Sequence, residues 1–392
     1  MRKIKLLLIV TMMLFLIVQN VYAIPAFARR YRISCTTCHD PFPRLKPYGD
    51  DFAGNGFVLD EEERARDYVS AGDDLMWLSR DFPLAVRFDA YAISDDNTAV
   101  KNDLEAPWGV KLMSGGSLYK NIGYYFYMYL SERGEVAGLE DAYIHFNNIR
   151  GMEMDLMVGQ FQTCDPLMKR ELRLTFEDYM IYKRKIGNSR TNLAYDRGII
   201  LTYGIEKTGT DLVAMVVNGN GIPHAGPDKM FDDDKYKNFG LRIAQGIGEN
   251  IGVGGFVYYG KEAQLDIGGM PKDMTNEMLY YGPDINVVYD RFAFTGQLLM
   301  RQDSDPLFMD GDEIMTNGIV AELVFSPNYD RSRFYYTFLY NRIDSDWDPA
   351  DYHSATLSAT YLLSRNLRLV GEYTMDMEHE ANRFVLGLNT GF

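Results

Sequence analysis

From about residue 83 onwards, apolar and polar side chains alternate in segments of about ten residues, separated by clusters of Gly, Asp, Asn and Pro. In the segment LAVRFDAYAI, Val86 and Phe88 fall on one face and Arg87 and Asp89 on the other. A period of two is typical of β-strands, whose successive side chains point to opposite faces. Because the charged face of nearly every segment cannot face lipid, we expect it to line a polar lumen. The pattern predicts an all-β fold, a transmembrane antiparallel β-barrel.

The alternation predicts about sixteen strands, an even number that suits a single-chain bacterial barrel. Their expected ranges are 83–94, 107–116, 121–131, 138–148, 152–161, 197–206, 211–219, 237–247, 250–260, 279–290, 291–301, 315–326, 333–343, 352–363, 366–375 and 381–392. Every second connection is then short. The longer connections are 95–106, 162–196, 220–236, 261–278, 302–314 and 344–351. A two-sheet sandwich is the alternative fold, but it does not require this alternation of short and long connections.

The longer connections should face the outside of the cell, and they are rich in acidic residues such as Asp232, Asp233 and Asp234. Two interpretations stay open: a hydrated crown that bridges lipopolysaccharide through divalent ions, or a mouth that gathers cations. The longest connection, 162–196, contains seven Lys and Arg residues. We expect it to fold inward and narrow the lumen, as the third outer loop of sixteen-stranded porins commonly does.

Residues 1–23 have the features of a secretory signal peptide: three basic residues, an apolar run over 6–18, and a cleavage site near Ala23. The apolar run is short for a membrane span, so an uncleaved anchor is the less favoured alternative. The formal net charge is −15, which argues against nucleic acid as a partner. We therefore expect export to the bacterial outer membrane, with a small helical segment at 24–80 and a lipid-contacting barrel at 81–392.

The segment before the barrel contains a C-x-x-C-H motif, formed by Cys35, Cys38 and His39. In an exported chain, this spacing provides two thiols for thioether bonds to a haem and an adjacent histidine as the proximal iron ligand. A thioredoxin-like site would need a βαβ context, and a zinc site would need further Cys or His residues nearby. The motif predicts one covalent haem c. The remaining cysteine, Cys164, is expected to be inert and buried, with a reactive or metal-binding role as the alternative.

The sequence does not identify the sixth ligand of the haem iron. No Met or His lies between His39 and Met76, so Met76 is the first candidate along the chain. His145 and Met157 fall on predicted lumen faces and are the candidates from the barrel. An amine or a water molecule could also take the sixth position, or the position could stay empty. The segment is also too small to wrap a haem alone, so we expect it to plug the lumen, with the barrel supplying the remaining walls.

The segment IPAFARRYRISCTTCHDPFPRLKPYGDDFAGNGF resembles the N-terminal haem segment of the fused outer-membrane monohaem cytochrome–porins, which include iron oxidases. The matching residues include Pro25, Phe27, Arg29, the C-x-x-C-H motif, Pro43 and Gly56. Downstream, VGQFQTCDPL is similar to a segment of phosphate-selective porins, but Gln162 stands where that type often has Lys. This difference argues against specific phosphate binding.

The resemblance implies a haem plug that carries electrons across the outer membrane. The donor would be extracellular Fe(II) or another redox partner, and the acceptor a periplasmic cytochrome or another carrier. The chain would then be an Fe(II)-oxidising cytochrome, an oxidoreductase. Two alternatives stay open: a solute porin for anions or phosphate with an accessory periplasmic haem segment, or an outward conduit that reduces extracellular metals.

Overall fold

The computed structural model describes residues 26–31, 33–57, 82–164, 166–226, 228–266 and 268–392. The signal peptide, Met76 and the boundary expected near residue 80 lie outside these residues. The described helices are α2 (Ala26–Tyr31), α3 (Cys35–Cys38), α4 (Pro47–Gly54) and α5 (Met180–Lys183). None of the helices in this part of the chain is long and apolar enough to cross a membrane.

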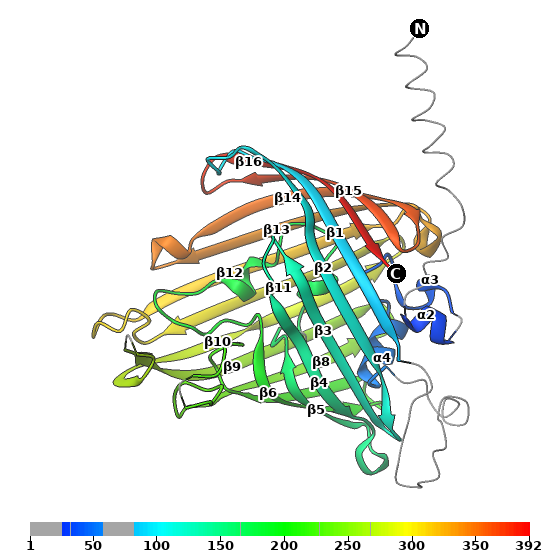
Figure 1. The fold of residues 1–392 in the computed structure, drawn as a ribbon. Coiled ribbons are helices and arrows are strands. Elements are labelled where there is room, and N and C mark those ends of the chain that lie inside the picture. Colours follow the sequence, from blue (N-terminus) through cyan, green and yellow to red (C-terminus); the bar gives the residue numbers. More distant parts are fainter. Residues whose placement is uncertain (1–25, 32, 58–81, 165, 227, 267) are drawn as a thin grey trace.

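Sixteen strands follow in the order of the sequence (Figure 1). They are β1 (Leu84–Asp95), β2 (Asn102–Tyr119), β3 (Ile122–Glu132), β4 (Gly138–Phe146), β5 (Met154–Phe161), β6 (Asp196–Ile205), β7 (Thr210–Val217), β8 (Asn238–Ile247), β9 (Ile251–Leu265), β10 (Pro271–Tyr289), β11 (Phe292–Asp303), β12 (Ile314–Phe325), β13 (Phe334–Ser345), β14 (Tyr352–Ser364), β15 (Leu367–Asp376) and β16 (Ala381–Gly391).

The strands form one closed antiparallel barrel, in which each strand pairs with its neighbours in sequence and β1 pairs with β16. The closing pair runs from Arg87 opposite Gly391 to Asp95 opposite Arg383. Closure removes the free edges of the sheet, so the backbone groups of the barrel can pair with each other, as a lipid environment requires. The predicted fold class and the number of strands are confirmed.

Three strands extend further than the alternation predicts. β2 already begins at Asn102. β9 continues to Leu265, and β10 begins at Pro271. The predicted long connections 95–106 and 261–278 are therefore wrong, because most of these residues extend the hairpins. Beyond the hydrocarbon region the outer face of a hairpin no longer contacts lipid and need not be apolar, so the alternation in the sequence weakens.

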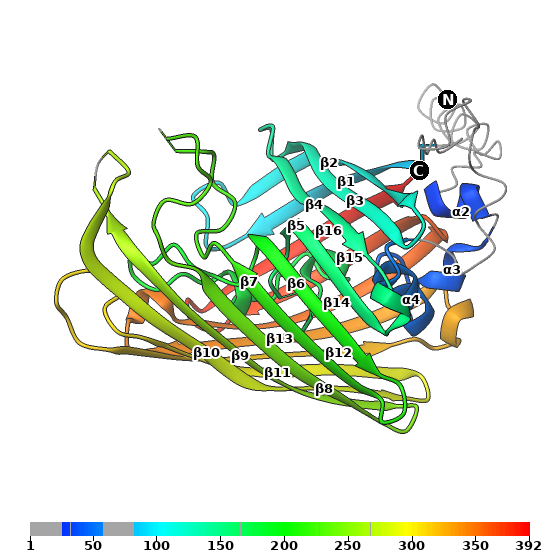
Figure 2. The same ribbon diagram turned by 90° about the horizontal axis from the view of Figure 1, so that it is seen from below.

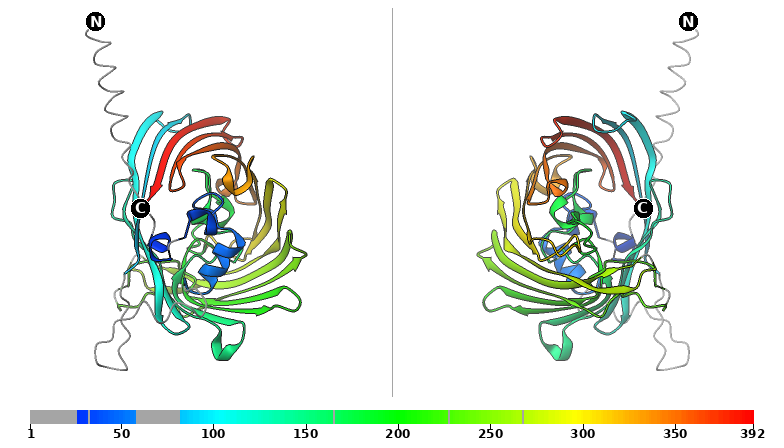
Figure 3. Two further views of the ribbon diagram at one scale, coloured as in Figure 1. Left: turned by 90° about the vertical axis from the view of Figure 1, so that its right-hand side faces the viewer. Right: turned by 90° about the vertical axis from the view of Figure 1, so that its left-hand side faces the viewer.

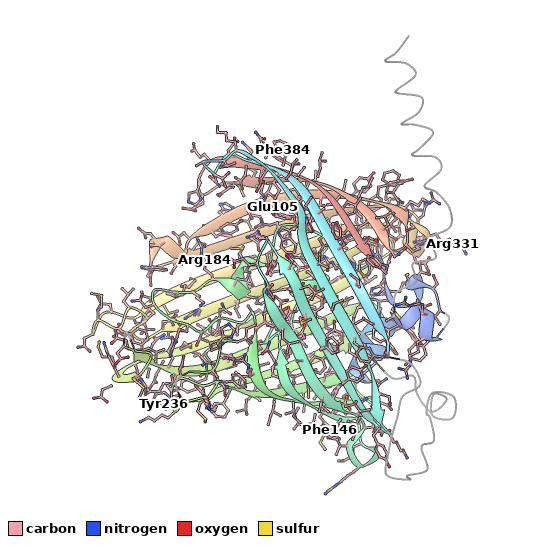
Figure 4. The ribbon with its side chains drawn as sticks, viewed as in Figure 1. Glu105, Phe146, Arg184, Tyr236, Arg331 and Phe384 are labelled. Carbon is pink, nitrogen blue, oxygen red and sulfur yellow. The ribbon has the colours of Figure 1, made fainter. Side chains whose placement is uncertain are left out.

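The two faces of the barrel wall differ as the sequence predicts. Along β1, Arg87 and Asp89 are buried in the lumen. On the outer face, Leu386 is 70% exposed, and Phe384 projects away from the barrel in Figure 4. Apolar side chains that face outward from a closed barrel form the belt that contacts lipid. This architecture is that of a bacterial outer-membrane protein.

The connection between β5 and β6, here called the lumen loop (162–195), folds into the barrel, as predicted. The end-on views of Figure 3 show it inside the ring of strands. Glu372 of β15 accepts hydrogen bonds from the backbone N–H groups of Phe176 and Glu177 at 2.7 and 2.9 Å. Four strands further round the barrel, Arg301 of β11 donates to the Thr191 carbonyl at 3.1 Å. These contacts attach the loop to widely separated strands and make it a constriction.

The described part of the chain before the barrel, residues 26–31 and 33–57, is here called the head segment. Its helices lie at one end of the barrel, beside the C-terminus (Figure 2). At that end the strands are joined by short connections, such as Lys120–Asn121 between β2 and β3. Short turns mark the periplasmic end of outer-membrane barrels. The head segment therefore lies at the periplasmic mouth.

Candidate functional site

The C-x-x-C-H motif lies on one helical turn that is capped at its start. α3 spans Cys35–Cys38, and the hydroxyl of Ser34 accepts a hydrogen bond from the Thr36 backbone N–H at 3.3 Å. At the other end, the His39 backbone N–H donates to the Cys35 carbonyl at 2.8 Å. Burial raises the pKa of both cysteines, so both remain thiols at neutral pH. The turn thus presents two unpaired thiols one helical turn apart.

α4 packs directly against the motif. The Lys46 backbone N–H donates to the Cys38 carbonyl at 2.8 Å, just before α4 begins at Pro47. A Cβ atom on Gly49 would lie 2.4 Å from the same carbonyl oxygen, so only glycine permits this approach. α4 thus belongs to the small helical segment expected before the barrel, and it supports the motif from behind.

The His39 imidazole is held in one orientation and one tautomer. Its Nδ1 lies 3.0 Å from the Pro43 carbonyl oxygen and 3.2 Å from that of Arg44. Because a carbonyl oxygen only accepts, Nδ1 carries the proton, and Nε2 keeps its lone pair. Burial also lowers the pKa of His39, which favours the neutral ring. A neutral imidazole with its second nitrogen anchored to a carbonyl is the form that binds a metal through Nε2.

Cys35, Cys38 and His39 line a cavity of about 210 Å³ between the head segment and the barrel. The head segment also supplies apolar side chains, including Phe27, Ile33, Phe42, Leu45, Phe52 and Phe57. The barrel wall supplies Ala85, Arg87, Met113, Ser114, Tyr125, Tyr127, Asp141 and Tyr143, and the lumen loop supplies Gln162, Lys169, Glu171 and Leu172. The head segment contributes one wall of the cavity, and the barrel and its loop complete the cavity.

An aromatic cluster joins the head segment to the barrel wall beside the cavity. Phe57 stacks on Phe27 at 5.2 Å and on Tyr125 of β3 at 4.7 Å between ring centroids. Phe27 also meets Phe52 edge to face at 5.3 Å. Such pairs add stability beyond their buried area, about 0.5–1.5 kcal/mol each. The cluster fixes the apolar side of the cavity across the boundary between the two parts.

Polar contacts hold the head segment at the periplasmic mouth. Lys169 of the lumen loop binds Asp50 of α4 at 3.0 Å, and Lys46 binds Asp330 of the β12–β13 turn at 3.4 Å. Arg331 of that turn is labelled at the same end of the barrel in Figure 4. The backbone carbonyl of Asn55 also accepts a hydrogen bond from the Asn147 side chain. These contacts come from opposite sides of the mouth.

A close backbone contact completes this attachment. A Cβ atom on Gly123 of β3 would lie 2.3 Å from the Gly56 carbonyl oxygen. The end of the head segment therefore rests directly on the barrel wall at a position where only glycine fits.

The predicted candidates for the sixth ligand do not line this cavity. His145 faces the lumen from β4 and is 5% exposed, but it is not among the cavity residues. Met157, opposite His145 on β5, packs against the core of the lumen instead. Met76 lies outside the described residues. His145 is thus correctly placed on the lumen face but not at the site.

Sequence reasoning missed Met113, Arg87 and Lys169 as residues of the site. Met113 lies two residues from Lys111 on β2, so both side chains point to the same face of the strand. The charge of Lys111 marks that face as the lumen face, so the sequence already indicated that Met113 faces the lumen. Its position beside the C-x-x-C-H motif depends on where the head segment docks, which strand periodicity does not encode. Cys164 is buried in the lumen loop, as expected.

The residues of the cavity fit a covalent haem. The two thiols and the Nε2 of His39 all belong to one cavity whose walls are largely aromatic and aliphatic. Arg87 and Lys169 bring positive charge to it, which suits the two carboxylate groups of haem. In the described part of the chain, no group of three or more His, Cys, Asp and Glu residues could hold a bare metal ion. The donor set therefore matches an iron porphyrin better than a zinc ion.

Comparison with solved structures identifies the barrel type. The anion-selective porin from Comamonas acidovorans superposes with a TM-score of 0.59 at 11% identity, over 80% of this chain and 99% of that one. The outer-membrane channel DcaP of Acinetobacter baumannii gives 0.56 at 14% identity, over 80% and 97%. Salmonella typhi OmpF in complex with daunomycin gives 0.53 at 8% identity, over 79% and 97%.

The chain has the fold of the outer-membrane porins. At these identities the likeness establishes the architecture alone. No protein-family model and no curated protein sequence matches the chain. The porin fold covers the strands and the lumen loop, and the C-x-x-C-H motif lies outside it, at the periplasmic mouth.

Proposed function

We propose that this porin-fold barrel holds one covalent haem c at its periplasmic mouth and carries electrons across the outer membrane. The observation that supports the proposal is the orientation of the C-x-x-C-H motif. Both thiols and the anchored His39 ring line the same cavity, and the barrel forms its other wall.

In this proposal the residues of the site have distinct roles. Cys35 and Cys38 form the thioether bonds, and His39 Nε2 is the proximal ligand of the iron. Arg87 and Lys169 balance the charge of the haem carboxylates, and the Phe27–Phe57–Tyr125 cluster excludes water from one side. The bound haem supplies one-electron transfer, and exclusion of water by the protein helps to set its potential.

The proposed direction is inward, from extracellular Fe(II) or another donor to a periplasmic cytochrome or similar carrier. The acidic outer connections would raise the local concentration of a cation such as Fe(II). Asp232 and Asp234, for example, lie in the β7–β8 connection, away from the head segment. With Fe(II) as the donor, the protein would be an oxidoreductase. The same residues would serve an outward conduit to extracellular metals if the potentials were reversed.

A solute porin is the second candidate, and the structural comparisons favour it more directly than electron transfer. The similar structures are porins and channels by their titles, and one is described as anion-selective. The inward-folded lumen loop also carries exposed basic residues that could line a path for anions, Lys183 and Lys185. In that case the head segment would be an accessory at the periplasmic mouth.

Two measurements on the purified full-length protein separate the candidates. The protein should be produced in cells with a cytochrome c maturation system, beside a Cys35→Ser/Cys38→Ser variant. Electron transfer predicts a covalent haem on the wild type and its reduction on addition of Fe(II). A wild-type chain without haem, or a haem that Fe(II) leaves oxidised, would contradict the proposal.

Ion conductance in planar bilayers provides the second measurement. A conduit should conduct weakly until the head segment is deleted, because that segment and the lumen loop obstruct the lumen. A solute porin should conduct equally well with the head segment present. In addition, His39→Ala should change the absorption spectrum of the attached haem, and an unchanged spectrum would exclude His39 as a ligand.

A further inference from the structure

The cavity has two sources of side chains, and the haem attachments all come from one of them. The head segment provides Cys35, Cys38 and His39, whereas β1–β4 and the lumen loop provide the remaining wall. A haem attached to Cys35, Cys38 and His39 would need a second iron ligand from outside the head segment, because the described residues of that segment contain no further His and no Met. The sixth ligand, if the protein supplies one, should be sought on the barrel and the lumen loop.

Several side chains on that wall carry an atom that could bind iron. They are Met113, Tyr125, Tyr127, Asp141, Tyr143, Lys169 and Glu171. His145 and Met157, the barrel candidates from the sequence, are not among them. Met113 is the one thioether, and no imidazole is present on this wall among the residues that the structure describes. Neutral thioether and imidazole ligands are the axial donors found in electron-transfer cytochromes c.

Lys169, Glu171 and Tyr127 are already engaged by other side chains. Lys169 is paired with Asp50 at 3.0 Å, and Glu171 accepts from Lys111 at 3.1 Å and from Tyr127 at 3.2 Å. Tyr125 is stacked on Phe57. Binding iron through one of the charged groups would break a contact that holds the lumen loop or the head segment. Met113 would lose only van der Waals contacts with the buried group that contains Tyr127 and Tyr129.

The strand pairing explains why Met113 faces the cavity with room beside it. Met113 is opposite Ala85 on β1 and opposite Tyr127 on β3, and both neighbours line the same cavity. The small Ala85 side chain leaves space beside the flexible methionine. Two residues along β2, a Cβ atom on Gly115 would lie within 3.2 Å of the rings of both Phe57 and Phe27. Met113 is thus held next to the point where the head segment meets the wall.

We propose that the Sδ atom of Met113 is the sixth ligand of the haem iron, so that the two axial ligands come from different parts of the chain. This inference rests on the proposed haem function. A methionine ligand raises the reduction potential relative to a second histidine. The reduction potential would then also depend on the contact between the head segment and the barrel. If the head segment left the barrel, the haem would lose Met113 as a ligand.

Met113→Leu is the main test, because Leu replaces Met with little change in volume and removes only the sulfur. Met157→Leu is the matched control, since Met157 is also a lumen-facing methionine but does not line the cavity. All three proteins should be compared as full-length, haem-loaded chains in detergent, with folding of the barrel checked by heat-dependent gel mobility. The readouts are the sulfur-to-iron charge-transfer absorption of the ferric haem, the midpoint potential, and the rate of imidazole binding.

We expect the charge-transfer absorption in the wild type and in Met157→Leu, and its loss in Met113→Leu, with a lower midpoint potential and faster imidazole binding. A wild type with covalent haem but without this absorption would overturn the Met113 assignment while leaving the haem proposal intact. Retention of the absorption in Met113→Leu would likewise overturn it. A wild type without covalent haem would overturn the proposed function itself, and the ligand assignment with it.

Discussion

Removal of the Glu372 carboxylate should loosen the lumen loop from the barrel wall. Glu372 of β15 is 4% exposed and accepts hydrogen bonds from the backbone N–H groups of Phe176 and Glu177 at 2.7 and 2.9 Å. Hydrogen bonds to a charged group contribute about 1.5–3 kcal/mol each. Glu372→Ala leaves both N–H groups without this acceptor, so the attached state of this part of the loop should lose at least about 3 kcal/mol. Since each 1.4 kcal/mol corresponds to about a tenfold change, its population relative to the detached state should fall about a hundredfold.

Single-channel recording in planar bilayers measures this change directly. Glu372→Ala should show higher conductance or more frequent opening than the wild type, because the loop constricts the lumen. Glu372→Gln should be intermediate, since an amide keeps one acceptor oxygen. Glu378→Ala is the control, because it removes the same charge from an exposed position in the β15–β16 turn. If Glu372→Ala behaves like the wild type and Glu378→Ala, the loop is not held by these bonds and the argument fails.

Three further predictions concern the attachment of the head segment and the loop. Gly123→Val should speed proteolytic release of the head segment, because its Cβ would overlap the Gly56 carbonyl. Gly255→Val is the control, because a Cβ atom there would meet nothing within 4 Å. Equal rates of release for the two variants would contradict the contact between Gly123 and Gly56. Asp330→Ala should change the thermal unfolding of the protein little, because the exposed pair of Asp330 with Lys46 contributes only about 0.5 kcal/mol. A large loss of stability would contradict this reasoning. Burial alone would raise the pKa of Asp178, but Arg173 and Arg170 hold it below the ordinary 3.8. The ion pairs of Asp178 with Arg170, Arg173 and Lys183, all within the lumen loop, should therefore keep the loop folded above that pH and weaken only as the pH falls below it. Conductance recorded against pH would test this, and opening already between pH 7 and 5 would count against it.

The barrel was predictable because lipid and lumen impose opposite demands on alternate residues. Charged residues such as Arg87 and Asp89 therefore mark the lumen face in the sequence, and the short and long connections mark the two ends. The prediction was wrong where that demand ends. The outer parts of β9 and β10 extend beyond the lipid belt, so their outer faces need not be apolar, and the alternation weakens although the backbone pairing continues.

The haem motif was also visible in the sequence, because its chemistry depends on local spacing. The residues that the barrel and the lumen loop contribute to the cavity could not be predicted from the sequence. Met113 lies there because β2 pairs with β1 and β3 in a particular register and because the head segment docks against Gly115 and Gly123. Those are contacts between residues far apart in sequence, and two of them depend on the absence of a side chain. The alternation along the strands therefore predicted that His145 and Met157 face the lumen, but not which lumen-facing residues meet the head segment.

Electron transfer across a membrane by the haem-loaded protein is the most direct test of the central claim. The protein should be inserted into liposomes that enclose a redox dye, with a membrane-impermeable reductant or Fe(II) added outside, and the rate of dye reduction recorded. We predict that dye is reduced by wild-type protein but not by the Cys35→Ser/Cys38→Ser variant, which keeps the barrel and cannot attach haem. Equal rates for the two proteins would mean that the barrel passes solutes, not electrons, and would contradict the account.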